Sequence, residues 1–189
     1  MSTTARENAR VARQAAKWQA EFQSLARRFY AGVYNYLCYV SRDAGLAEDL
    51  TQETFMRIWQ NPPELRDKGA LRAWVYRVAR NEFLQHRRRA GLSIVAFDDC
   101  PEAEHFEAVA ADPQARLEIQ NLCLAVRRAV GMLPDLYREV IVLHNLEQLS
   151  LAQIAQVLEV PVGTVKSRRA KAFSALRHLL QEEVVGNEV

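Results

Sequence analysis

The sequence predicts an all-α fold in which two small helical domains are joined by a flexible acidic linker. Apolar residues recur at helical spacing along most of the 189 residues, and the alternating β-branched runs typical of strands are few. Only 7 glycines and 6 prolines interrupt this pattern. Helices are therefore expected over residues 15–42, 46–60 and 70–89, and the helical pattern resumes at Pro113.

The linker is indicated by a change of composition between residues 90 and 115. This stretch holds six acidic residues and no lysine or arginine, and Gly91, Pro101 and Pro113 punctuate it. We expect one domain at residues 1–89 and a second at residues 116–189.

The composition of the whole chain, with 49% hydrophobic and 25% charged residues, indicates a folded protein. No apolar run approaches the length that crosses a bilayer, so membrane insertion is not expected. The N-terminus is basic but lacks the apolar core of a secretory signal, and we expect a cytoplasmic protein. The N-terminus is interpreted as a helical or frayed lead-in, and residues 1–15 are expected to be flexible, with no assigned role.

Neither a catalytic constellation nor a metal site is indicated, and we expect no cofactor and no small-molecule substrate. The four histidines are scattered, and no set of cysteines and histidines has the spacing of a zinc site. Three cysteines far apart argue against a disulfide framework. Cys38 and Cys123 lie in apolar helical contexts and are expected in the core. A redox or metal role for Cys100 or His105 stays open.

The second domain contains the pattern of a helix-turn-helix. Ser150 and Gln153 fit a capping box, in which each side chain satisfies a backbone N–H at the helix start. Ile154, Ala155 and Leu158 give this short helix its buried face. The turn "EVPVG" follows, and its proline favours the start of a second, longer helix.

The second helix of this motif lies within residues 161–180, which carry five basic residues and no acidic one. Val165, Ala172, Leu176 and Leu179 fall on one side, and the opposite side is small, polar and cationic. Such a face suits the major groove of DNA, where a carboxylate would be repelled by phosphates. A solvated amphipathic helix would carry similar charge. The capped helix and tight turn before it favour a DNA-recognition helix.

Two helices of the first domain carry surfaces of opposite charge. Helix 46–60 has a polar, acidic stripe that should face water or a basic protein, because phosphates would repel it. Segment 66–89 holds eight basic residues against two acidic ones. Its arginines alternate with aromatic residues and an amide, which suits single-stranded or distorted DNA. Trp74 itself is expected to pack in the core. The stripe consists of Asp49, Gln52, Glu53, Met56 and Gln60.

Three segments in this order resemble the bacterial RNA polymerase sigma factors of the extracytoplasmic-function (ECF, group 4) type. They are "AEDLTQETFMRIWQ", "LRAWVYRVARNEFLQHRRR" and "LPDLYREVIVLHNLEQLSLAQIAQVLEVPVGTVKSRRAKAFSALR". The resemblance covers nearly the whole chain. It implies that residues 1–89 are sigma region 2, residues 90–115 the variable linker and residues 116–189 sigma region 4.

The resemblance implies a promoter-specificity subunit that binds core RNA polymerase, recognises −35 and −10 elements and melts the promoter. Asn81 occupies the position that captures a flipped base, and nearby arginines would hold phosphates. Ala170 stands where relatives often carry a larger residue, which leaves the contacted −35 bases open. The implied contacts with the clamp helices of the largest polymerase subunit are Glu48, Asp49, Gln52 and Glu53. Those with the −10 element are Arg77, Arg80, Asn81 and Arg88. Those with the −35 element are Thr164, Lys166, Ser167, Arg168, Arg169 and Lys171.

The resemblance also implies control by an anti-sigma factor and association with the nucleoid when the chain is bound to polymerase. The identity of the regulator, the inducing signal and the promoter sequence are not encoded in any pattern that we recognise. The acidic linker would extend toward the active-site and RNA-exit channels of the polymerase.

Two other classes of protein are alternatives. A stand-alone helix-turn-helix regulator would dimerise and bind an inverted repeat without polymerase. A sigma-like adaptor would bind polymerase without starting transcription. The acidic stripe disfavours the first, since a self-contained repressor does not need it, and the basic segment 77–89 disfavours the second.

Overall fold

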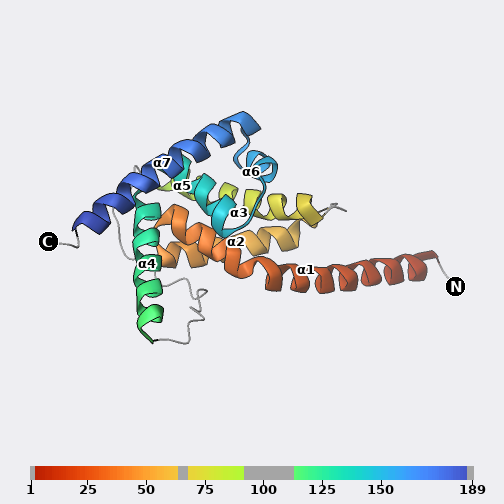
Figure 1. Ribbon diagram of the computed structural model, residues 1–189. Coiled ribbons are helices and arrows are strands. Elements are labelled where there is room, and N and C mark those ends of the chain that lie inside the picture. The colour runs from red at the N-terminus through yellow and green to blue at the C-terminus, as the bar shows by residue number, and fades with distance from the viewer. Residues whose placement is uncertain (1–2, 64–67, 92–112, 187–189) are drawn as a thin grey trace.

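The computed structural model describes residues 3–63, 68–91 and 113–186 (Figure 1). Every regular element in these ranges is helical and none is a strand, so the predicted all-α class is confirmed. Most of the predicted acidic linker, with Cys100 and His105, lies outside the described residues. The elements are α1 (Thr3–Ser41), α2 (Ala44–Gln60), α3 (Lys68–Ala90), α4 (Pro113–Met132), α5 (Asp135–Ile141), the π-helical turn η1 (Val142–Leu146), α6 (Leu151–Leu158) and α7 (Val162–Gly186).

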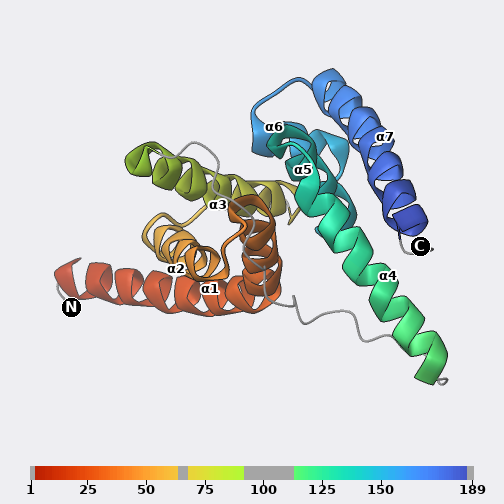
Figure 2. The same ribbon diagram turned by 90° about the vertical axis from the view of Figure 1, so that its left-hand side faces the viewer.

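The flexible lead-in expected at residues 1–15 is the main correction. These residues are helical from Thr3 onward and continue directly into α1, whose N-terminal half projects beyond the other helices (Figures 1 and 2). Alanine and arginine dominate this stretch, and both have high helix propensity. Chain termini are often frayed, but here the helix propensity favours an extension of the helix.

α1, α2 and α3 pack together as an N-terminal lobe. α1 ends at Ser41, and Arg42 turns the chain in the left-handed region with φ 61°. Asp43 then caps α2, because its Oδ1 accepts a hydrogen bond of 2.9 Å from the Leu46 backbone N–H. The buried side of α2 includes Leu50, Thr54 and Ile58, as its helical spacing predicts.

The C-terminal lobe is organised around a buried arginine. Arg138, on α5, donates from Nε to the Val130 carbonyl at 3.3 Å and from Nη2 to the Gly131 carbonyl at 3.0 Å. These carbonyls lie in the last turn of α4, where no intrahelical donors are available. A single guanidinium therefore holds the end of α4 against α5.

The predicted helix-turn-helix is formed by α6 and α7. The capping box is confirmed: Ser150 N–H donates to Gln153 Oε1 at 2.8 Å, and Gln153 N–H donates to Ser150 Oγ at 3.3 Å. Glu159 adopts φ 56° and ends α6, and Pro161 precedes α7.

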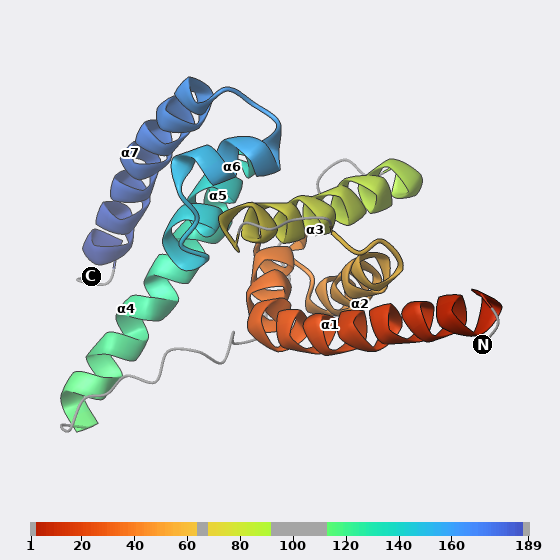
Figure 3. The same ribbon diagram turned by 90° about the vertical axis from the view of Figure 1, so that its right-hand side faces the viewer.

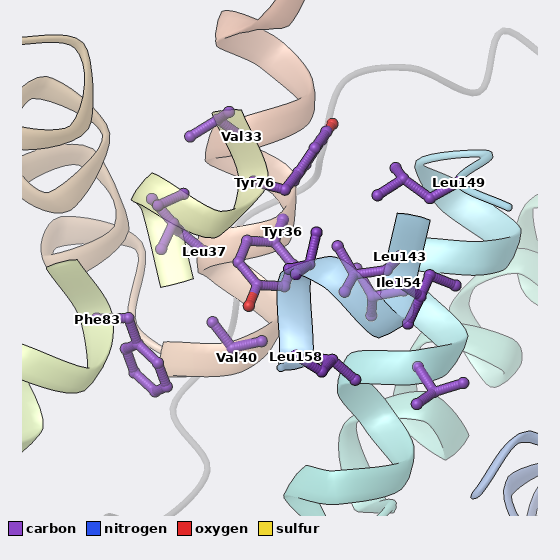
Figure 4. Packing of buried hydrophobic residues seen from close by; sticks show 14 of the residues in the cluster. Val33, Tyr36, Leu37, Val40, Tyr76, Phe83, Leu143, Leu149, Ile154 and Leu158 are labelled. Atoms are coloured by element: carbon purple, nitrogen blue, oxygen red, sulfur yellow. The ribbon is translucent and has the colours of Figure 1, made fainter. Parts of the chain in front are cut away.

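The two lobes share one continuous core. α3 lies against α6, and α1 lies against α5 and η1 (Figure 3). Figure 4 shows Tyr36 and Val40 of α1 beside Leu143 of η1 and Leu158 of α6, and these four side chains belong to one buried cluster. The described helices thus form a closed arrangement in which α3 packs on both lobes.

Candidate protein and nucleic-acid interfaces

The outer side of α2 carries the acidic stripe. Glu48, Asp49, Gln52 and Glu53 are all exposed. Met56 continues the same side, with 61% of its surface exposed. The stripe therefore offers carboxylates together with apolar surface, which suits a basic protein better than DNA.

An aromatic cluster that the sequence interpretation missed supports the end of this stripe. Trp59 of α2 meets Phe22 of α1 edge to face, with ring centroids 5.0 Å apart, and stacks on Trp18 at 6.2 Å. Trp18 Nε1 also donates to the Trp59 carbonyl at 3.1 Å. The spacing of Trp18 and Phe22, four residues apart on one helix, was the available signal.

α3 presents its candidate DNA-binding residues on its exposed edge. Arg77, Asn81 and Arg88 are exposed, whereas Arg80 is half-buried. Trp74 is half-buried and packs against the core, as expected, and it lines a small cleft of about 270 Å³ between α3 and α6.

An ion pair between a partly exposed arginine and a buried glutamate links α3 to α2. Arg57 of α2 donates from Nη2 to Glu82 Oε2 of α3 at 3.3 Å, and the Glu82 side chain is only 5% exposed. The acidic stripe and Asn81 therefore belong to one rigid unit. Sequence reasoning noted Glu82 only as an exception to the basic pattern, because its partner lies 25 residues away.

Contacts between the lobes involve the candidate DNA-binding helix directly. Glu139 Oε1 of α5 accepts from Arg80 Nε at 3.2 Å and from the Tyr36 hydroxyl at 3.3 Å. Asp135 Oδ2 accepts from Arg87 Nη1 at 3.3 Å. These pairs join residues at least 48 positions apart, so no local pattern predicts them.

A third carboxylate from the C-terminal lobe contacts α3 nearer to the N-terminal end of that helix. Glu147 accepts from the Tyr76 hydroxyl, and the Arg72 guanidinium donates to the Glu147 main-chain carbonyl. Burial raises the pKa of Glu147, and the Tyr76 hydrogen bond and Arg72 offset only part of this effect. Burial also raises the pKa of Glu139, against the lowering effects of Arg80 and Tyr36.

The exposed face of α7 has the predicted composition. Lys166, Ser167, Ala170 and Lys171 are exposed. Thr164, Arg168 and Arg169 are half-buried at the edges, and the Arg169 guanidinium lies over the Phe173 ring, 5.5 Å from its centroid. The predicted apolar side is confirmed for Val165, Ala172 and Leu176, which are buried.

An apolar groove of about 1100 Å³ lies between α4 and α7. Leu122, Val126 and Phe173 line it, and the Arg127 and Arg177 side chains contribute to its wall. Cys38 is buried as expected, but Cys123 is half-buried and faces this groove instead of the core. The lining of this groove is mainly apolar.

Other kinds of site are not found within the described ranges. No three His, Cys, Asp or Glu side chains gather there as a metal site would require. Among the described helices, none combines the length and the apolar character needed to cross a membrane.

Comparison with known proteins places these surfaces in a family context. The model of sigma-70 region 2 matches residues 25–92, and that of sigma-70 region 4 matches residues 123–176. The ECF RNA polymerase sigma factor SigL of Mycobacterium tuberculosis is 34% identical over 175 residues, covering 92% of this chain and 97% of SigL. SigW of Bacillus subtilis is 31% identical, over 72% of this chain and 76% of SigW.

A solved structure shows the same arrangement of helices. The sigma factor RpoE in complex with the anti-sigma factor NepR, from Bartonella quintana, superposes with a TM-score of 0.66 at 25% identity. The superposition covers 85% of this chain and 97% of RpoE, and so includes both lobes.

The raised carboxyl pKa values predict that the contributions of Glu139 and Glu147 to stability fall as the pH rises. A carboxyl group with a higher pKa in the folded chain stabilises the fold below its unfolded-state pKa, and this contribution disappears through the folded-state pKa. Glu147→Gln removes one such group, so its free energy of unfolding relative to wild type should increase with pH above about 4.3. Urea unfolding at a series of pH values measures this difference.

The exposed Glu48→Gln variant is the control for the loss of one carboxylate. A difference between Glu147→Gln and wild type that stays constant, or that falls as the pH rises, would contradict the assignment of Glu147 as a desolvated acid.

Proposed function

We propose roles for the surfaces of this chain on the premise that it belongs to the ECF family of RNA polymerase sigma factors. A sigma factor is the promoter-specificity subunit that directs transcription initiation. The observation that carries the proposal is the division of charge: an acidic stripe on α2, and basic exposed edges on α3 and α7, all within the family-matched residues.

We assign the acidic stripe to core polymerase. Glu48, Asp49, Gln52 and Glu53 would meet the clamp helices of the largest subunit, and their exposure supports this role. Met56 and Trp59 add apolar surface beside them, as a protein interface requires. The aromatic contacts of Trp59 with α1 hold this surface in place.

We assign the exposed edge of α3 to the −10 element. Asn81 would capture a flipped base, and Arg77 and Arg88 are placed to hold phosphates beside it. Arg80 is available for this role only after it leaves Glu139. Unstacking a base costs a few kcal/mol, which these contacts must offset.

The exposed face of α7 would read the −35 element in the major groove. Lys166, Ser167 and Lys171 project from the outer side of the helix, while Thr164, Arg168 and Arg169 lie at its edges. The capped α6 and the left-handed turn at Glu159 set the angle at which α7 meets DNA. The small Ala170 leaves room for a base edge to approach the helix.

The remaining proposals concern regulation and location. An anti-sigma factor would hold the chain inactive, and the similarity to RpoE in complex with NepR supports this. The apolar groove between α4 and α7 offers a surface for a protein partner. We propose that the chain acts in the cytoplasm, on the nucleoid when bound to polymerase, and that it catalyses no reaction itself.

A transcription assay on a promoter library with purified core polymerase tests the proposed function. Initiation that depends on this protein, with a shared −35 and −10 pair among the products, is the expected result. Retention on core without initiation would favour the adaptor. DNA binding without any core binding would favour the stand-alone regulator.

Charge reversal on the acidic stripe should weaken core binding. The Asp49→Lys, Glu53→Lys double variant should lower affinity for core by about tenfold or more, because charged interface pairs become repulsive. Surface plasmon resonance with immobilised core measures the change. Glu21→Lys, an exposed site on α1, is the matched control. Unchanged affinity of the double variant, with normal helicity by circular dichroism, would remove the stripe from the interface.

Asn81→Ala should impair promoter opening more than closed-complex formation, because its side chain is assigned to a base that leaves the stack only on opening. We expect a loss of about tenfold or more in open complex, measured by permanganate reactivity of unpaired thymines. Gel-shift measurements at low temperature report the closed complex. An equal loss at both steps would reject base capture.

A further inference from the structure

The C-terminal lobe places carboxylates on the arginines of α3. Glu139 pairs with Arg80, and the two side chains are only 9% and 16% exposed. Asp135 pairs with Arg87 one helical turn from there along α5. Carboxylate and phosphate oxygens form similar charge-assisted hydrogen bonds with a guanidinium, so an arginine that is held by a carboxylate is not available to a phosphate.

These contacts extend along most of α3. At its N-terminal end, Gln153 Nε2 of α6 donates to the Gly69 carbonyl at 3.0 Å, and Glu147 receives the Tyr76 hydroxyl. Residues 69–87 span about 27 Å of helix. The C-terminal lobe therefore covers one side of α3 along this length, and Figure 3 shows α6 against it.

The surface of the N-terminal lobe is shaped for this contact. Gly32 lies within α1, where a Cβ would overlap both the Glu147 carboxylate and the Tyr76 hydroxyl. Glycine inside a helix costs about 1 kcal/mol relative to alanine. α1 thus contains a residue that destabilises the helix at the point where the C-terminal lobe contacts it.

The side-chain contacts of Glu139 and Glu147 belong to the junction and not to their own lobe. Glu139 is bound by Tyr36 and Arg80, and the Glu147 carboxylate by Tyr76, all from α1 or α3. The contact between the lobes therefore removes both carboxylates from water. Their removal leaves the described side-chain bonds within the C-terminal lobe intact.

We propose that the free chain is closed by a carboxylate latch, in which Asp135, Glu139 and Glu147 hold α3 and compete with DNA for it. The C-terminal lobe then withholds Arg80 and Arg87 from DNA until the two lobes separate, while the exposed edge of α3 with Asn81 stays uncovered. The inference rests on the proposed role of α3 in binding DNA. The closure itself does not depend on that role and is measured separately.

Small-angle X-ray scattering of the full chain tests the closure. Wild type should have the radius of gyration of the closed structure. Glu139→Lys places a second cation beside Arg80 and should increase this radius, while circular dichroism shows unchanged helicity. Adding Arg80→Glu recreates the ion pair with reversed charge and should restore the compact form. An expanded wild type, or a Glu139→Lys variant that stays compact, would overturn the latch.

Binding of a fluorescein-labelled oligothymidylate without polymerase tests the competition. If only the open chain binds the oligonucleotide, the apparent affinity of the wild type is lowered in proportion to the fraction of chains that are open. We expect Glu139→Lys to raise this apparent affinity by about tenfold. Glu21→Lys makes the same charge change on the far part of α1 and controls for non-specific attraction. Equal gains in both variants, or none in an expanded Glu139→Lys, would overturn the competition while leaving closure established. Neither the scattering measurement nor the oligonucleotide binding measurement depends on transcription. A chain that does not act as a sigma factor would therefore be recognised only in the promoter-library assay.

Discussion

The position of α3 between the two lobes is the constraint on which the rest of the structure depends. One side of this helix buries Val75, Ala79 and Phe83, and another receives α6. Only a narrow edge remains for polar side chains, and Arg77, Asn81 and Arg88 occupy it. Since the Arg57–Glu82 pair also anchors α3 to α2, the helix has one orientation relative to the acidic stripe.

The energetics of the junction suit a contact that must open. Buried ion pairs contribute little net stability, because desolvation of the charges offsets much of their attraction. They do impose specificity, since a mispaired buried charge costs several kcal/mol. The apolar part of the junction, with Tyr36 fully buried beside Leu143, supplies the favourable burial term. Glu139 and Glu147 therefore determine where the lobes meet more than how tightly.

Local patterns predicted the helices, the capping box and the two faces of α7, because each depends on residues within a few positions of one another. Two local predictions failed for physical reasons. The N-terminal stretch has high helix propensity and extends α1, and Cys123 lies on an apolar helix that is only partly covered. The interlobe pairs depend on separations of 48 to 103 residues, which no spacing rule reaches. Sequence reasoning therefore assigned Arg80 to phosphates, although Glu139 occupies it in the closed chain.

The surfaces of the N-terminal lobe that we assign to polymerase and to DNA lie on different helices, α2 and α3. α2 lies on the side of α3 away from α6, and its carboxylates stay exposed while Arg80 and Arg87 are engaged (Figure 3). With the proposed roles, a closed chain would present its acidic stripe to core polymerase while Arg80 and Arg87 are still held by the C-terminal lobe. Docking of the stripe alone does not displace Glu139, because the two surfaces do not overlap. With the proposed roles, release of Arg80 would require the C-terminal lobe to engage a partner of its own as well.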